Sequence, residues 1–146
     1  MTETGPIEFF LVEENEADIM AFRRAWKSAG GGHPLQVVPG GKSCLELLED
    51  RNRKRTEGRE TPPAVVILND RMSTMGGVET LKSIRATDDF THVPVVMLMA
   101  SSETYRELKA YRLGANAYIV KPMEFDRLVE IIQIVVGFWE LAELPT

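Results

Sequence analysis

The sequence has almost no cysteine. Cys44 is the only one in 146 residues, which excludes an intrachain disulfide framework and fits a reducing compartment. No apolar run approaches membrane-spanning length, and the N-terminus lacks the basic start of a signal peptide. The net charge of −5 gives no reason to expect a nucleic acid or a membrane as partner. His33 and His92 have no companions at ligand spacing, so zinc is not expected. We expect a single-domain cytoplasmic protein.

The chain does contain short apolar runs that alternate with segments of helical spacing. The central run, residues 64–68, is bounded by two prolines and two glycines and is typical of a strand buried on both faces. The alternation predicts an α/β fold, a doubly wound five-stranded parallel sheet of the flavodoxin-like (βα)5 kind. The expected strands are 7–12, 35–38, 64–69, 93–99 and 117–120, and the expected helices are 17–29, one capped by Ser43 with Glu46, 78–86, 101–113 and 125–136. Residues 51–63 are polar and are expected to form an exposed loop or a frayed helix end.

Polar side chains follow several of these strands. Glu13 and Glu14 follow the first, Asn69 ends the third, and Lys121 follows the fifth. In open α/β sheets ligands bind beyond the carboxyl ends of the strands, where the chain order reverses. The first and third strands are neighbours there, so we expect the two carboxylates to lie close to Asn69.

Three stretches carry a resemblance to a known family. They are LVEENEAD at residues 11–18, the Met72, Met75 and Gly77 loop, and GANAYIVKP at residues 114–122. Together they resemble the CheY-like response-regulator receiver domain over residues 7–136, after a leader at 1–6. The aromatic extension at 137–146 resembles that of the small stand-alone response regulators associated with bacterial phytochromes, which often dimerise.

The resemblance implies a role for particular positions. In the family an acidic pair binds Mg²⁺, an Asp ending the third strand accepts a phosphoryl group from a histidine kinase, and a Thr or Ser ends the fourth strand. A Lys ends the fifth strand, and an aromatic residue on it switches rotamer. Carried over by motif, these positions are Glu13 and Glu14, Asn69, Met99, Lys121 and Tyr118. Asn69 and Met99 do not match the family, so the phosphorylation site is degenerate.

Asp70 is the alternative acceptor. Counting back from Gly77 and forward to Lys121 both place the family's Asp at position 69. A one-residue slip would also reverse every side chain of the strand. We therefore reject Asp70 as the acceptor.

Asn69 and Met99 change the expected chemistry. A carboxamide is a poor nucleophile towards phosphorus, and Met99 has no hydroxyl for a phosphoryl oxygen. With Glu13, Glu14 and Lys121 the pocket carries a net charge of about −1 instead of about −2, so Mg²⁺ binding should be weak or lost. The alternative for the acidic pair is an ordinary helix N-terminal cluster with no metal. We expect Lys121 to pair with Glu14, Tyr118 to be static and Cys44 to be buried.

Three functions compete for this sequence. The first is a stand-alone receiver in two-component phosphorelay signalling that no longer uses phosphorylation and binds a histidine kinase or other signalling protein. The alternative is a conventional phospho-accepting receiver whose acceptor Asp is changed to Asn69 in this copy. An enzyme on a flavodoxin-like scaffold ranks last, because no nucleophile and base pair follow the strands.

The last residues suggest an interface. Phe138, Trp139, Leu141 and Leu144 form an apolar cluster, and such clusters are typical of docking surfaces. We expect a homodimer through the last helix and this extension. The alternative is that the tail folds back over its own sheet edge and hides Trp139. No output domain is expected to follow, so output should occur by protein contact.

Overall fold

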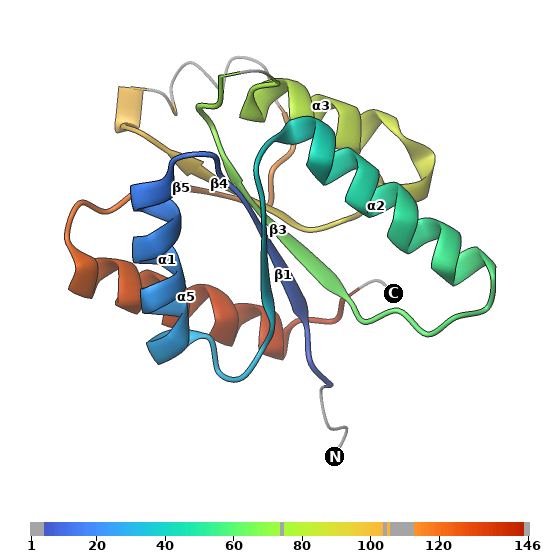
Figure 1. The fold of residues 1–146 in the computed structure, drawn as a ribbon, viewed down its shortest axis with the longest axis horizontal. Helices are drawn as coiled ribbons and strands as arrows, with labels where there is room; N and C mark the ends of the chain where they lie inside the picture. The colour runs from blue at the N-terminus through green and yellow to red at the C-terminus, as the bar shows by residue number, and fades with distance from the viewer. Residues whose placement is uncertain (1–4, 74, 104, 106–112, 145–146) are drawn as a thin grey trace.

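A computed structural model describes residues 5–73, 75–103, 105 and 113–144. Its five strands form one parallel sheet in the order β2-β1-β3-β4-β5 (Figure 1). This confirms the predicted doubly wound topology, with the chain order reversing between β1 and β3. The strands are β1 (Glu8–Val12), β2 (Leu35–Val38), β3 (Ala64–Asn69), β4 (Val95–Met99) and β5 (Ala117–Val120).

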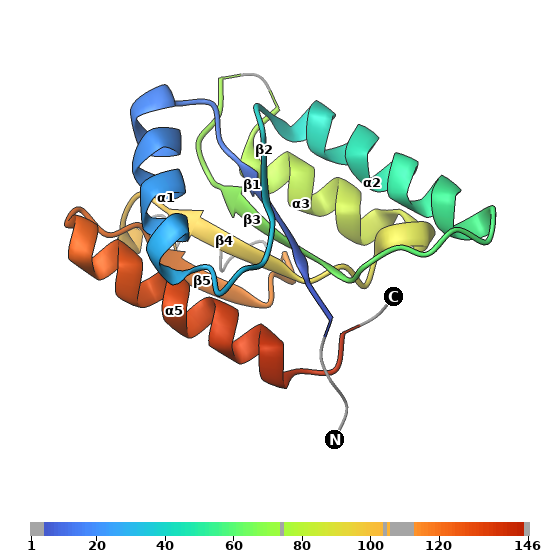
Figure 2. The ribbon, with the colours of Figure 1, turned by 60° about the horizontal axis from the view of Figure 1, so that its bottom comes forward.

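Helices cover both faces of the sheet. Helices α1 (Glu16–Ala29) and α5 (Phe125–Leu141) pack together on one face, and α2 (Gly41–Thr56) and α3 (Gly77–Ala86) on the other (Figure 2). A short 3₁₀ helix, η1 (Asp88–Phe90), precedes β4. The predicted helix over 101–113 is helical at Ser102, Glu103 and Tyr105, and most of its remainder lies outside the described residues. No helix in the described part of the chain is long and apolar enough to cross a membrane.

The core has two halves, one on each face of the sheet. All six residues of β3 are buried, as expected for a strand covered on both sides. The half under α1 and α5 includes Phe9, Leu11, Phe22, Trp26, Ile67 and Trp139, and the half under α2 and α3 includes Val12, Cys44, Leu68, Leu81, Met97 and Met99. Cys44 is fully buried, as predicted.

The start of α2 differs from the prediction. The helix begins at Gly41, with Gly40 in an extended conformation and no side-chain cap. The prediction that Ser43 and Glu46 cap this helix was therefore wrong. A β-carbon at Gly41 would lie 2.1 Å from Thr80 Oγ1, because α2 and α3 approach closely there. The helix continues to Thr56, so the first part of 51–63 is helical. Strand β4 starts at Val95, whereas the predicted strand started at Val93. Val93 instead donates its backbone N–H to the Phe90 carbonyl in the turn after η1.

The last helix is longer than predicted. It continues through Gly137 to Leu141, so the boundary placed at residue 136 falls inside α5. Ile132, Val136 and Trp139 are spaced i, i+4 and i+7 and bury one face of it. Trp139 is only 7% exposed and packs in its own domain's core. It is hidden within its own chain, as the alternative expects, but by the continuation of α5 and not by a tail that folds back over the sheet edge.

His33 fixes the far end of α5. Its Nδ1 accepts the backbone N–H of Ile7 at 3.0 Å, so Nε2 carries the ring proton of the neutral form and donates to Glu140 at 2.8 Å. The Trp26 indole N–H donates to the His33 carbonyl at 2.8 Å. These contacts join the start of β1, the end of α1 and the last turns of α5.

Candidate functional site: an acidic pocket at the carboxyl ends of the strands

The predicted residues from β1, β3 and β5 meet at the carboxyl edge of the sheet. A pocket there is lined by Glu13, Glu14, Asn15, Asp18, Asn69, Asp70, Arg71, Ala100, Lys121, Pro122 and Met123. The parallel register places Val12 beside both Val38 and Leu68, so the residues that follow β1 enter the pocket beside Asn69. The expected meeting of the acidic pair with position 69 is found for Glu13, which accepts a hydrogen bond from Asn69, and Glu14 lines the same pocket.

Glu13 is the centre of this pocket. It is 2% exposed. Its Oε2 accepts the backbone N–H groups of Glu14 (3.0 Å) and Asn15 (3.2 Å), where the chain turns into α1. The same oxygen accepts Asn69 Nδ2 at 3.1 Å, and Oε1 accepts Lys121 Nζ at 2.7 Å. Four donors thus satisfy this buried carboxylate.

Asn69 uses both hydrogens of its amide within the pocket. Besides the bond to Glu13, its Nδ2 donates to the carbonyl of Arg71 at 2.8 Å, and the side chain is buried. Asp70 lies further out, where its Oδ2 accepts the Ala100 backbone N–H at 3.3 Å. Asn69, and not Asp70, therefore faces Glu13, in agreement with the predicted register.

Lys121 does not pair with Glu14, and that prediction was wrong. Its Nζ donates to Glu13 at 2.7 Å and to Asp18, in the first turn of α1, at 2.9 Å. Burial disfavours the charged ammonium, but the hydrogen bonds and charges of Asp18 and Glu13 outweigh it and raise the pKa of Lys121 above its ordinary value. We did not predict Asp18 as a partner of Lys121. Asn15 could have pointed to it, because Asn15 caps α1 by accepting the Asp18 backbone N–H and so places Asp18 in the first turn of the helix.

Glu14 points away from Glu13. Its carboxylate accepts the backbone N–H of Ser73 and, at 2.7 Å, the Ser73 hydroxyl. Ser73 belongs to the loop between β3 and α3, so Glu14 ties this loop to the one that follows β1. The two adjacent acidic side chains therefore serve different partners because Glu13 turns inward under the N-terminus of α1.

The two remaining positions lie near the pocket without polar contact to it. Met99 is 2% exposed and belongs to the core half under α2 and α3. The Tyr118 hydroxyl accepts the Ala115 backbone N–H at 3.3 Å, and its ring packs edge-on against Tyr105 with centroids 5.4 Å apart. These contacts hold the side chain in place, as the static interpretation expects, but they do not test whether it switches.

The pocket does not fit Mg²⁺ as it stands. Mg²⁺ requires several oxygen ligands in near-octahedral geometry, whereas Glu13 already faces an ammonium and an amide and Glu14 faces Ser73. Within the described ranges, no three or more His, Cys, Asp or Glu side chains are grouped to hold a metal ion. The groups that face the two carboxylates are hydrogen-bond donors, whereas a metal ion would need oxygen ligands in their place.

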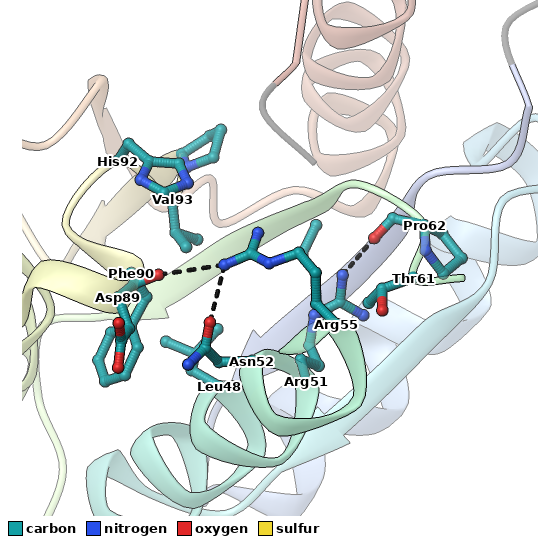
Figure 3. Close-up of a pocket in the computed structure, with 12 residues that line it drawn as sticks. Leu48, Arg51, Asn52, Arg55, Thr61, Pro62, Asp89, Phe90, His92 and Val93 are labelled. Carbon is teal, nitrogen blue, oxygen red and sulfur yellow. Dashed lines mark hydrogen bonds between the residues drawn. The ribbon is translucent and has the colours of Figure 1, made fainter. Parts of the chain in front are cut away.

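A second pocket lies at the opposite edge of the sheet, between the end of α2 and η1 (Figure 3). Arg51 donates to Glu8 and to the Pro62 carbonyl, and Arg55 donates to Asn52 at 2.9 Å and to the Asp89 carbonyl at 3.4 Å. The guanidinium groups thus join α2 to the segments before β3 and β4. This arrangement is structural and shares no residue with the acidic pocket.

The predicted interface residues occupy different environments. Phe138 is 59% exposed and Leu141 is 90% exposed, whereas Trp139 is buried and Leu144 packs partly against the core. Ile134, which the sequence pattern did not single out, is 64% exposed. Ile134, Phe138 and Leu141 follow one another at i, i+4 and i+7, so they form an exposed stripe on α5.

Comparison with known proteins gives consistent matches. Residues 9–133 match the model of the response regulator receiver domain. The probable methanogenesis regulatory protein FilR2 of Methanothrix harundinacea is 28% identical over 134 residues, which cover 92% of this chain and 84% of FilR2. The chain spans only 20% and 26% of the length of two longer regulatory proteins that it also matches.

Solved structures show the same fold. Response regulator RPA3017, from red light signalling of R. palustris, is 29% identical with a TM-score of 0.81, and the match covers 97% of this chain and 99% of that one. The phosphorylated cyanobacterial phytochrome response regulator RcpA is 26% identical with a TM-score of 0.76, covering 97% of this chain and all of RcpA (100%).

Proposed function

The chain belongs to the response-regulator receiver family of two-component signalling, and we propose that it is an atypical receiver that acts through protein contacts without being phosphorylated. The observation that carries this proposal is the chemistry of position 69. The side chain there is an amide that donates to Glu13 and to the Arg71 carbonyl. Phosphoryl transfer to a receiver needs a carboxylate oxygen that attacks phosphorus while the donor's leaving group departs, and an amide does not provide it.

Met99 supports the same proposal independently. A phosphoryl group at the end of β3 would need a hydrogen-bond donor from the end of β4, and the thioether of Met99 is buried in the core and offers none. Ala100, the next residue, also lacks a hydroxyl. Both losses affect one reaction, so a receiver that no longer uses phosphorylation explains them together.

The test is phosphorylation by a small acyl-phosphate donor with Mg²⁺, followed by intact-mass spectrometry. Wild type should gain no phosphoryl group, and the double variant Asn69→Asp, Met99→Thr should gain a labile one. Asp70→Asn is the matched control, because Asp70 is the other pocket carboxylate beside position 69. A wild-type gain that Asp70→Asn abolishes would contradict the proposal and identify Asp70 as an acceptor.

The second candidate is a conventional receiver in which only the acceptor was changed. It is favoured by Glu13, Glu14 and Lys121, which match the family in type and lie at the carboxyl edge of the sheet. On this hypothesis Asn69→Asp alone restores phosphorylation as fully as the double variant does. A single variant much slower than the double variant argues against it.

The proposed partner is a histidine kinase or another signalling protein in the cytoplasm. Exposed apolar side chains lie at the pocket: Met123 lines it and is fully exposed (101%), and Phe125 at the start of α5 lies close by and is 37% exposed. Grouped apolar side chains at the surface are typical of binding faces. No catalytic role is proposed for any residue, and the net charge of −5 favours a protein over a nucleic acid.

We further propose a homodimer through the stripe of Ile134, Phe138 and Leu141 on α5. A symmetric pair would bury both copies of the stripe at once.

Light scattering should give a dimer mass for wild type and a monomer mass for Phe138→Glu with Leu141→Glu. Met20→Glu, an equally exposed apolar position on α1, should stay dimeric. A wild-type monomer at tens of micromolar would end this proposal, and a truncation at Gly137 is unsuitable because it removes Trp139 from the core.

A further inference from the structure

We propose that the protein supplies its own counter-charge and hydrogen-bond donors to the acidic pocket, so that Lys121, Asn69 and Ser73 complete it without a divalent cation, and that Asn69 is the residue on which this depends. The inference deepens the proposed function and rests on it. It assigns the pocket a standing, metal-free arrangement that holds the loops after β1 and β3 in place.

The first observation is that four donors already surround Glu13. Its two oxygens receive one ammonium, one amide and two backbone N–H groups at 2.7 to 3.2 Å. A cation at Oε2 would have to displace one of three N–H groups, and a cation at Oε1 would share that oxygen with the Lys121 ammonium, a like charge. Displacing Lys121 would leave a partly buried ammonium with only the half-exposed Asp18 (47% exposed). Removing one partner from a buried ion pair is strongly unfavourable.

The second observation is that Glu14, the other carboxylate of the acidic pair, already accepts hydrogen bonds from the loop after β3. Glu14 receives both the backbone N–H and the hydroxyl of Ser73. A cation held by both carboxylates would have to compete with Ser73 for Glu14 and with Lys121 for Glu13. Metal ligation by both carboxylates would therefore weaken the contacts that hold the β3–α3 loop.

The third observation concerns the two acceptors that meet at Asn69. Its Nδ2 lies 3.1 Å from Glu13 Oε2 and 2.8 Å from the Arg71 carbonyl oxygen. A carboxylate in the same place would bring oxygen against oxygen at both contacts, with no proton between them. Only a cation, or an added proton, would relieve that repulsion. Asn69→Asp should therefore convert a self-sufficient pocket into one that needs a metal.

The experiment is thermal unfolding in chelator and in rising MgCl₂, with KCl at matched ionic strength. Wild type should unfold at the same temperature in both salts. Asn69→Asp should unfold at a lower temperature than wild type in chelator and recover by roughly 5 to 10 °C at saturating Mg²⁺. Asn69→Leu, which removes the donors without adding charge, is the matched control and should be destabilised with no response to Mg²⁺.

One further measurement, made on wild type, decides the matter if Asn69→Asp does not fold. In wild type, Mn²⁺ should not selectively broaden the amide NMR signals of Glu13 and Asn69. A saturable, Mg²⁺-specific stabilisation of wild type, selective Mn²⁺ broadening, or an Asn69→Asp variant indifferent to Mg²⁺ would each overturn the inference. Metal binding without phosphorylation would overturn it and leave the proposed function standing.

Discussion

Removing the Lys121 ammonium should destabilise the fold, because it is the one cation paired with the buried Glu13 carboxylate in the described structure. The Lys121 side chain is 26% exposed and that of Glu13 is 3% exposed. Breaking a buried pair costs roughly 3 to 5 kcal/mol. Partial exposure of Lys121 and the three N–H donors that Glu13 keeps reduce this, so we expect about 2 to 3 kcal/mol for Lys121→Met.

The assay is urea unfolding followed by tryptophan fluorescence, since Trp26 and Trp139 both lie in the core. The midpoint should fall with no change in slope, as for a loss of stability without a change in exposed surface. Arg127→Ala is the matched control: it removes an exposed ion pair with Glu130 and should cost only about 0 to 1 kcal/mol. A Lys121→Met midpoint equal to that of the control would refute the assignment of Lys121 to a buried pair.

The same pair predicts an alkaline dependence. The pKa of Lys121 is raised above its ordinary value of 10.5 in the folded protein, so its stabilising effect is complete below that value and is lost as pH rises through the folded pKa. The stability difference between wild type and Lys121→Met should therefore be constant near neutral pH and shrink only above about pH 10. A difference that disappears between about pH 6 and 8 would contradict this.

Three other changes test contacts elsewhere in the fold. Arg85→Met should cost about 2 to 4 kcal/mol in urea unfolding, because Arg85 donates to three carbonyls that would lose this donor, and also to Asn116 Oδ1, which keeps the Val95 backbone N–H; a cost near zero would show that water replaces it. Gly77→Ala should cost about 1 to 3 kcal/mol by the same measurement, since a β-carbon there would lie 2.3 Å from the Asn69 carbonyl oxygen, and a neutral result would mean that the loop moves freely. Burial raises the pKa of the Cys44 thiol to about 12, so a thiol reagent at about pH 8 should label it only after unfolding; rapid labelling of the native protein would contradict its burial.

The sheet and the ends of its strands were predictable because their signals are local. The apolar run before Asn69 is bounded by prolines and glycines, and strands of period 2 allow only one register that keeps the core faces inward. That register also brings Asn69, Glu13 and Lys121 to the same edge of the sheet. The predicted positions were right because they depend on strand order alone.

The partners of those residues were not predictable in the same way. Glu13 and Glu14 are identical in type, and only the turn into α1, where two backbone N–H groups close over one carboxylate, decides which of them lies inward beside Lys121. Asp18 reaches Lys121 from the first turn of α1, a contact across more than 100 residues of chain that local spacing does not reveal. The predicted helix ended at residue 136, although the spacing of Val136 and Trp139 continues the buried face through Gly137.

The most direct test of phosphorylation independence is the intact mass of the wild-type protein after incubation with a small acyl-phosphate donor and Mg²⁺. The amide at position 69 faces Glu13 and the Arg71 carbonyl, so we expect no change in mass. The double variant Asn69→Asp, Met99→Thr in the same reaction shows that the donor is active. A labile gain of one phosphoryl group by wild type would show that this receiver is still phosphorylated.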